Sequence, residues 1–264
     1  MSEFEPQTAV ITGGASGIGL AFAHRLAGRG CTVLIADLPG ENLEALAEQG
    51  FATQACDVSD LGQVEALADT AFDRLASVDL VLNNAGVGGA PGKLWEVDPA
   101  DARRLFDVNY WGVWHGCRAF APRLIGQETP SAIYNTGSEN SLFCGVPQAA
   151  AYVSAKHGVL GLTESLREDL PPHVHAGTII PGWVFTAIGP EQMMRHAMGV
   201  DDYVDLALPQ ILARRRFVVS HGYNQVRIAE RMDELAESYQ AHALVAEEDQ
   251  KHDVRLVLQK MMQR

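Results

Sequence analysis

The sequence predicts an α/β fold: a Rossmann-type, doubly wound parallel sheet of about seven strands with helices on both faces. Two observations predict it. Short apolar runs rich in β-branched residues alternate with longer helical patterns, and the first run leads directly into a glycine-rich turn. Such alternation implies parallel strands joined by crossover helices, which cover both faces of a sheet. No repeat or linker interrupts the pattern, so we expect a single domain over residues 1–264.

The expected strands are short apolar runs, because a strand buried on both faces has no polar side. They are Thr8 to Thr12, Cys31 to Ala36, Phe51 to Ala55, Val78 to Leu82, Ala132 to Asn135, Ala176 to Ile180 and a short strand within Arg216 to His221. The helical patterns between them are Gly17 to Arg29, Glu41 to Gln49, Leu61 to Leu75, Ala100 to Leu124 and Ala150 to Leu170. Gly30 and Gly50 follow two of these helices, where a residue of positive φ commonly ends a helix.

The composition argues against several classes of protein. With 47% hydrophobic residues the chain can bury a core, so it is not disordered. A formal charge of −13 opposes binding to nucleic acid or to a membrane surface, although local backbone dipoles can still hold an anionic cofactor. The N-terminus does not resemble a secretory signal, and no apolar stretch is long enough to span a membrane. The four cysteines are widely spaced, so we expect a cytoplasmic protein with four buried thiols and no metal site.

The turn after the first strand has the residues that a pyrophosphate requires. Residues 12–19 read TGGASGIG and open a helix; glycines there allow positive φ and let backbone N–H groups approach the phosphates. Asp37 ends the second strand, where a carboxylate accepts hydrogen bonds from the adenosine ribose and repels a 2′-phosphate. Leu38 offers no positive charge to offset that repulsion. The pattern therefore favours NAD over NADP as the cofactor. Asp37 could instead have a purely structural role as the N-cap of the helix that follows.

A second group of polar residues is suited to proton transfer. Tyr152 and Lys156 are four residues apart on an expected helix and share one face. A nearby ammonium stabilises a phenolate, so the pair can exchange a proton with a secondary alcohol or a ketone. Ser138 follows the fifth strand, at the edge of the sheet where ligands bind in this class of fold. An exposed Tyr–Lys pair on a helix surface is the structural alternative.

Three motifs together resemble the compact branch of the short-chain dehydrogenase/reductase (SDR) family: TGGASGIG at 12–19, NNAG at 83–86 and YVSAK at 152–156. The resemblance covers residues 8–186 well and the remainder loosely.

The resemblance implies a role for each of four residues. Tyr152 is the general acid/base, and Ser138 holds the substrate oxygen. Lys156 binds the nicotinamide ribose and lowers the pKa of Tyr152. Asn109 supports a proton relay to water; on its own, such an asparagine in a helix would more often bond its own backbone.

The resemblance also implies a dinucleotide site made from the loops that follow successive strands. Its expected members are Gly13, Ser16, Gly17, Ile18, Gly19, Asp37, Leu38, Asp57, Val58, Asn84, Ala85, Gly86, Tyr152, Lys156, Pro181, Gly182, Val184 and Thr186.

Residues 187–214 are the expected substrate lid. Their methionines are suited to an irregular apolar ligand, although a methionine-rich helix is more often part of a core. The expected substrate contacts are Ser138, Asn140, Phe143, Val146, Tyr152, Met193 and Met194. They indicate a mid-sized, apolar or aromatic alcohol or ketone.

Residues 222–264 are the expected C-terminal helical extension. Two apolar stripes at helical spacing predict it, one formed by Ile228, Met232, Leu235 and Tyr239 and the other by Val254, Val257, Leu258 and Met261. Surface helices at the sheet edge, a subunit interface and an active-site cover all fit these stripes. We expect a homodimer or a homotetramer, with the two long helices, 100–124 and 150–170, as one possible dimer interface.

The sequence therefore predicts an NAD-dependent oxidoreductase that interconverts a small-molecule secondary alcohol and a ketone. One alternative is a dinucleotide-sensing protein without catalysis, which would not need the set Asn109, Ser138, Tyr152 and Lys156. Another is a relative that reduces C=C or C=N bonds, or a dehydratase.

Overall fold

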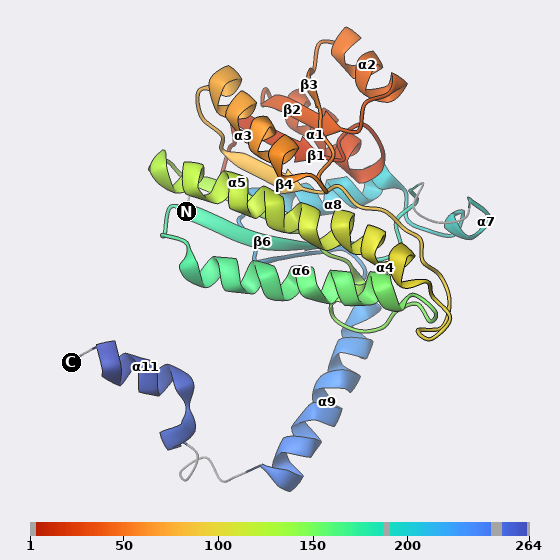
Figure 1. Ribbon diagram of the computed structural model, residues 1–264, viewed down its shortest axis with the longest axis vertical. Helices are drawn as coiled ribbons and strands as arrows, with labels where there is room; N and C mark the ends of the chain where they lie inside the picture. The colour runs from red at the N-terminus through yellow and green to blue at the C-terminus, as the bar shows by residue number, and fades with distance from the viewer. Residues whose placement is uncertain (1–3, 187–190, 244–249, 263–264) are drawn as a thin grey trace. The chain divides into compact units, whose positions relative to one another are not determined.

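The computed structural model describes residues 4–186, 191–243 and 250–262 (Figure 1). The chain divides into two compact units, Met1–Gly222 and Tyr223–Arg264. The first unit holds the whole sheet, and the second consists of helices.

One parallel sheet of seven strands forms the centre of the first unit, in the order β3-β2-β1-β4-β5-β6-β7. The strands are β1 (Thr8–Thr12), β2 (Thr32–Asp37), β3 (Ala52–Ala55), β4 (Leu80–Asn83), β5 (Ser131–Thr136), β6 (Val174–Ile180) and β7 (Phe217–Val219). The chain builds outward from β1 to β3 and then returns to place β4 on the other side of β1. The loops after β1 and β4 therefore diverge at the sheet edge, which is where dinucleotides bind in doubly wound folds. The predicted fold class is confirmed.

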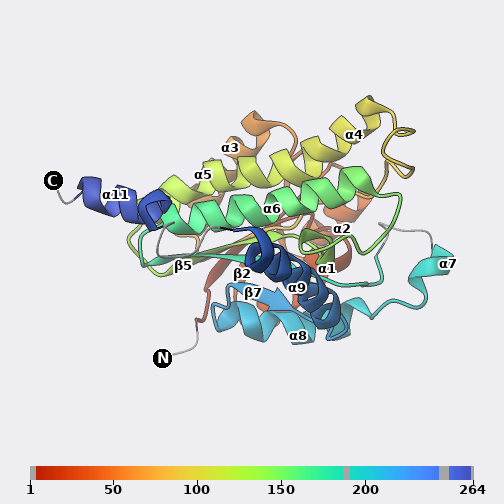
Figure 2. The same cartoon turned by 90° about the horizontal axis from the view of Figure 1, so that it is seen from below.

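Helices cover both faces of the sheet. They are α1 (Gly17–Gly28), α2 (Glu41–Glu48), α3 (Leu61–Leu75), α4 (Pro99–Phe106), α5 (Gly112–Gly126), α6 (Ala150–Asp169), α7 (Glu191–Met194) and α8 (Val200–Leu212). Figure 2 shows the layers: α3, α5 and α6 lie on one side of the sheet, and α8 lies on the other. One apolar core joins the sheet to α1, α2 and α8, and a second joins it to α3, α5 and α6.

The single helix expected from Ala100 to Leu124 is interrupted. Between α4 and α5 the chain forms a π-helical turn, Asp107–Trp111, in which the N–H of Gly112 donates to the carbonyl of Asp107. Gly112 packs directly on Val58, and a Cβ at Gly112 would lie 2.7 Å from a methyl carbon of that side chain. π-helical turns commonly mark functional sites, and this one contains Asn109.

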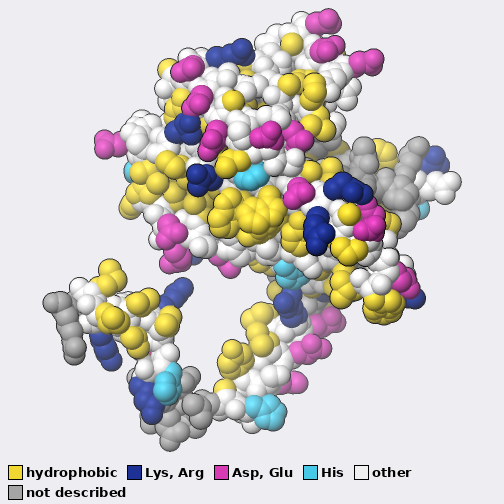
Figure 3. All heavy atoms as spheres, in the orientation of Figure 1, with side chains coloured by type: hydrophobic (Ala, Val, Ile, Leu, Met, Phe, Trp, Pro, Cys, Tyr) yellow, Lys and Arg dark blue, Asp and Glu magenta, His cyan; other side chains and the backbone are white. Residues whose placement is uncertain are grey.

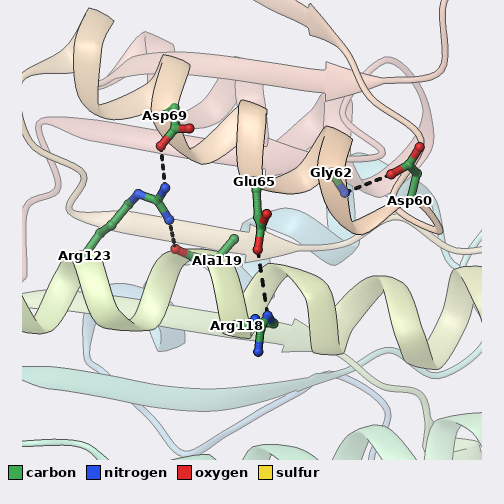
Figure 4. A network of polar contacts seen from close by, with 7 residues as sticks. All are labelled: Asp60, Gly62, Glu65, Asp69, Arg118, Ala119 and Arg123. Carbon is green, nitrogen blue, oxygen red and sulfur yellow. Dashed lines mark hydrogen bonds and ion pairs between the residues drawn. The ribbon is translucent and has the colours of Figure 1, made fainter.

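Exposed ion pairs connect α3 to α5 (Figure 4). The Arg123 guanidinium donates to Asp69 and to the carbonyl of Ala119, and Arg118 lies 3.8 Å from Glu65. Each pair is exposed to solvent and contributes little alone. The apolar contacts between the helices and the sheet therefore provide most of the stability on this face.

Three of the four cysteines are buried, as predicted, but Cys144 is exposed. It lies in the loop between β5 and α6, outside both cores. Burial raises the pKa of the Cys56 thiol to about 11 and the pKa of Cys31 and of Cys117 to about 12. The expectation of four buried thiols is therefore wrong at Cys144.

The C-terminal unit contains α9 (Asn224–His242), a 3-10 turn (Gln250–His252) and α11 (Val254–Met262). These helices form where the apolar stripes predict them. The stripe residues are exposed along most of both helices, among them Met232, Leu235, Tyr239, Val254 and Met261. No helix in the described part of the chain combines the length and apolar character needed to cross a membrane.

Substitution of Gly116 tests how tightly α5 packs on the sheet. A Cβ at this position would overlap the side-chain oxygen of Asn83, whose amide donates to Asn135 inside the core. Gly116→Ala should lower the free energy of unfolding by about 1–3 kcal/mol, measured by urea denaturation. Gly126→Ala, at the open end of the same helix, should be neutral or stabilise by up to about 1 kcal/mol. Equal effects of the two substitutions would contradict the packing described here.

Candidate active site

The glycine-rich turn after β1 presses against the loop after β4. Gly13 has a φ of +63°, and a Cβ there would lie 2.6 Å from the Cα of Ala85. The Asn84 side chain donates to the carbonyls of Thr12 and Gly13, both at 3.2 Å. The Asn84 amide nitrogen thus fixes the glycine turn to the loop after β4.

The N-terminus of α1 offers backbone donors to a phosphate. The helix begins at Gly17, and the N-cap residue Ser16 makes no side-chain hydrogen bond to it. The first N–H groups of a helix have no partner within the helix, and its dipole favours an anion at that end. The Thr186 methyl group lies 3.5 Å from the point that a Cβ on Gly17 would occupy, so the segment after β6 reaches the same helix end.

Asp37 lies between this turn and the N-terminus of α2. Its two carboxylate oxygens accept hydrogen bonds from the N–H groups of Ala15 and Leu38, each at 2.8 Å. Beside it is a cavity of about 340 Å³, also lined by Ser16 and Glu41. The N-cap of α2 is Gly40, so Asp37 is not the N-cap, and its carboxylate remains available at the cavity wall.

Asp57 and Val58, two expected members of the dinucleotide site, also make contacts within the protein. An Asp57 oxygen accepts from the N–H and the hydroxyl of Ser59. Val58 is buried against Gly112, and its carbonyl lies 2.9 Å from the His115 ring nitrogen Nδ1. The side chain of Val58 is therefore part of the core.

Ser138, Tyr152 and Lys156 converge beyond the carboxyl end of β5. The Ser138 hydroxyl lies near that of Tyr152 and acts to lower its pKa. The Lys156 ammonium donates to the carbonyl of Thr136 at 2.8 Å and lies 5.8 Å from the centre of the Tyr152 ring. Ser141 connects the two elements: it accepts from the N–H of Ser138 and donates to the carbonyl of Lys156. The turn after β5 and α6 are thereby fixed to each other.

Asn109 completes this group from the π-helical turn. Its side chain is fully buried and forms two hydrogen bonds with Val87, one to the N–H and one to the carbonyl, both at 2.8 Å. Gly86 separates Asn109 from Lys156: a Cβ there would lie 3.1 Å from the Asn109 oxygen and 3.7 Å from the Lys156 nitrogen. The side chain of Asn109 therefore bonds the backbone of the loop after β4, not its own helix.

Burial dominates the electrostatics of this group. It lowers the pKa of Lys156 to about 8. It also raises the pKa of Tyr152, an effect that Ser138 opposes and the negative charge of Glu139 reinforces. Desolvation of the phenolate is the largest of the effects on the Tyr152 pKa. The lowering of that pKa by Lys156 stays a prediction.

The segment after β6 is held on two sides. The Pro181 carbonyl accepts from the N–H of Glu139 at 2.8 Å, and a Cβ on Gly182 would overlap the ring of His221. Val184, an expected cofactor contact, is buried in the core beside α8. Any contact that Val184 makes with a ligand must therefore come from its backbone.

Residues 200–212 of the predicted lid region form a helix that packs in the core. Residues 187–190 and the side chain of Met193 lie outside the described part of the chain. Residues 200–212 form α8, whose Tyr203 and Ile211 are fully buried in the core. Met194 is also buried, and its sulfur accepts a hydrogen bond from the Trp183 indole. Only the stretch before α8 remains a candidate lid.

Two of the expected substrate contacts serve the loop itself. Asn140 is buried; its amide bonds the Ser138 hydroxyl at 3.4 Å and the Gly145 N–H at 2.9 Å. Phe143 is buried, with its ring edge beside Gly145. Val146 is 47% exposed and remains available to a ligand. Glu139, which follows Ser138 and acts through its charge on Tyr152, is absent from the predicted site residues.

Comparison with known proteins agrees with this geometry. The profile of the family described as short chain dehydrogenase matches residues 7–195. The chain belongs to the short-chain dehydrogenase family.

Two relatives of the chain are named as dehydrogenases of hydroxyl-bearing compounds. The 1-deoxy-11-beta-hydroxypentalenate dehydrogenase of Streptomyces avermitilis is 36% identical over 88% of this chain and 90% of its own length. The (-)-trans-carveol dehydrogenase of Rhodococcus erythropolis is 32% identical over 70% of this chain and 74% of its own. A crystal structure of a short-chain dehydrogenase/reductase from Burkholderia phymatum in complex with NAD superposes with a TM-score of 0.81, at 32% identity, over 90% of this chain and 97% of that one.

The buried ammonium of Lys156 predicts a specific dependence of stability on pH. Its pKa is about 8 in the folded chain and about 10.4 when unfolded, so between these values the unfolded state binds more protons. The free energy of unfolding, relative to Lys156→Met, should therefore rise by up to about 3 kcal/mol from pH 7 to pH 10.5. Denaturant titrations of the wild-type protein and of Lys156→Met at each pH measure this difference. The contribution of cysteine ionisation is the same in both proteins and cancels. A difference that stays constant with pH would contradict the burial of a charged Lys156.

Proposed function

We propose that the chain is an NAD-dependent oxidoreductase that interconverts a secondary alcohol and a ketone. The observation that carries the proposal is the convergence of Ser138, Tyr152 and Lys156 at the edge of the sheet that bears the glycine turn. This placement brings a proton-transfer group close to a cradle suited to a dinucleotide.

The residues present fit a nicotinamide dinucleotide. The free end of α1 and the glycine turn would hold the pyrophosphate, and Asp37 would accept hydrogen bonds from the adenosine ribose. Lys156 would hold the nicotinamide ribose, and Thr186 the carboxamide side. A bound nicotinamide supplies the hydride chemistry.

The side chains of this site would handle the proton and the substrate oxygen. Ser138 holds the oxygen through its hydroxyl, and Tyr152 takes the proton from the alcohol or returns it to the ketone. The raised pKa of Tyr152 keeps it protonated at neutral pH, the form that donates to a ketone. Asn109 acts as a positioning residue, because its side chain is bonded at both ends to Val87.

The surroundings favour an apolar skeleton. Val146, Trp183 and Phe185 are exposed in the loops that follow β5 and β6, and the Trp183 indole donates to the sulfur of the buried Met194. The names of the relatives, a carveol dehydrogenase and a hydroxypentalenate dehydrogenase, support a mid-sized cyclic alcohol as the class of substrate.

A homodimer through α5 and α6 fits the surface of the first unit. Figure 3 shows hydrophobic side chains gathered over α5. Trp111 and Trp114 are 43% and 41% exposed, with ring centres 5.6 Å apart. Exposed apolar patches of this kind commonly mark protein interfaces.

Tyr152→Phe tests the proton-transfer role. Loss of the hydroxyl should lower kcat by about a hundredfold to ten-thousandfold, while NADH binding, measured by fluorescence titration, is retained. Tyr203→Phe is the matched control, because that buried hydroxyl lies in the core and has no hydrogen-bond partner among the residues that the structure describes. Near-normal turnover by Tyr152→Phe would refute the assignment.

Asp37→Asn tests the preference for NAD. The amide oxygen can still accept from Ala15, but the charge that repels a 2′-phosphate is removed. The Kd for NADPH, measured by calorimetry, should fall by about tenfold or more relative to that for NADH, equivalent to about 1.4 kcal/mol. Glu48→Gln, at the far end of α2, makes the same change in charge and should leave the ratio at its original value. A wild-type chain that binds NADPH more tightly would refute the preference.

A further inference from the structure

The helix α9 of the C-terminal unit has a narrow apolar stripe along one face. Its members are Ile228, Met232, Leu235 and Tyr239, at successive spacings of four, three and four residues. Because an α-helix has 3.6 residues per turn, these side chains lie above one another over about three turns. Met232 is 55% exposed and Tyr239 is 66% exposed. This spacing is that of the apolar seam through which two helices pack in a coiled coil.

One flank of the stripe has small side chains, and most of the acidic side chains lie far from it. Ala229 and Ala236 are on this flank, seven residues apart, where small side chains allow a second helix to approach closely. Glu230, Asp233 and Glu237 lie on the opposite face of α9, by the same helical geometry. Two copies of this acidic helix can therefore meet along the stripe without bringing these carboxylates together.

The other flank carries opposite charges in its two halves. Arg227 and Arg231 lie in its first half, and Glu234 and Ser238 lie in its second. Whatever these side chains bond within their own helix, the flank is positive toward the N-terminus of α9 and negative toward its C-terminus. A second α9 in the antiparallel orientation places each positive half against a negative half, whereas a parallel one places arginines against arginines. The charges therefore fit a second copy of the same helix in one orientation.

We propose that the stripe of α9 binds α9 of a second copy of this chain, in the antiparallel orientation. One register places Met232 against Leu235 of the partner subunit. The same register places Arg231 opposite Glu234 of the partner subunit, and the two-fold axis repeats both contacts. This interface is separate from the one proposed through α5 and α6, and it does not depend on the proposed enzyme activity.

Leu235→Glu in the full-length chain tests the stripe. A charge in the middle of the seam should halve the number of chains in the assembly, measured by sedimentation velocity. Val226→Glu is the matched control: Val226 is 62% exposed and lies about two and a half turns before Leu235, on the opposite face of α9, so the wild-type mass should remain. An unchanged mass for Leu235→Glu would overturn the proposal. A lower Tm at unchanged mass would show that the stripe packs within its own chain.

Exchange of charge between two chains tests the antiparallel pairing. Arg231→Glu makes the charged flank more acidic and Glu234→Arg makes it basic throughout, so each variant alone should dissociate at about tenfold higher concentration or more. Coexpression of the two variants should restore the wild-type mass, because each contact then joins a guanidinium to a carboxylate. An ion pair within one helix would not be restored by mixing chains. Failure of the mixture to assemble would overturn the proposal.

Trp114→Glu separates this interface from the one proposed through α5 and α6. A mass that falls with Trp114→Glu and not with Leu235→Glu would refute the α9 contact alone. A mass that falls with Leu235→Glu and not with Trp114→Glu would support the α9 contact and refute the interface through α5. A monomeric wild-type chain would refute both.

Discussion

The contact between the loops after β1 and β4 is the constraint on which the active site depends. Gly13 and Ala85 touch, and the Asn84 amide bonds the carbonyls of Thr12 and Gly13. The loops at a topological switch point diverge and leave a crevice between them. The contact between Gly13 and Ala85 forms the bottom of this crevice. A side chain at position 13 would push the two loops apart. The N-terminus of α1 and the residues that follow Ala85 would then move together.

The proposed catalytic side chains are held by the same loop after β4. Gly86 follows directly and lies beside both Asn109 and Lys156. Asn109 bonds Val87, and Lys156 bonds the Thr136 carbonyl at the end of β5. The side chains proposed to handle the proton are thus attached to two neighbouring strand ends, those of β4 and β5. Such preorganisation lets a site act without reordering its own groups.

The sequence predicts the sheet, most helices and the glycine and tyrosine motifs, because each depends on a local pattern. Thr8–Thr12 and Leu61–Leu75, for example, have the predicted bounds. The π-helical turn could not be predicted, since it depends on how Gly112 meets Val58, far away in sequence. The burial of Asn140 and the core position of α8 likewise depend on tertiary packing. An apolar, methionine-containing stretch has the same local pattern whether it covers a ligand or a sheet.

The exposure of Cys144 has a practical and a chemical consequence. The other three thiols of the chain are buried with raised pKa values, so thiol-specific reagents should reach Cys144 first. Its loop also contains Val146 and adjoins the turn that carries Ser138. A fluorophore attached there would report directly on movement of the loop as ligands bind. An electrophile or oxidant that modifies this thiol would add bulk to the loop that follows Ser138 without touching a catalytic group.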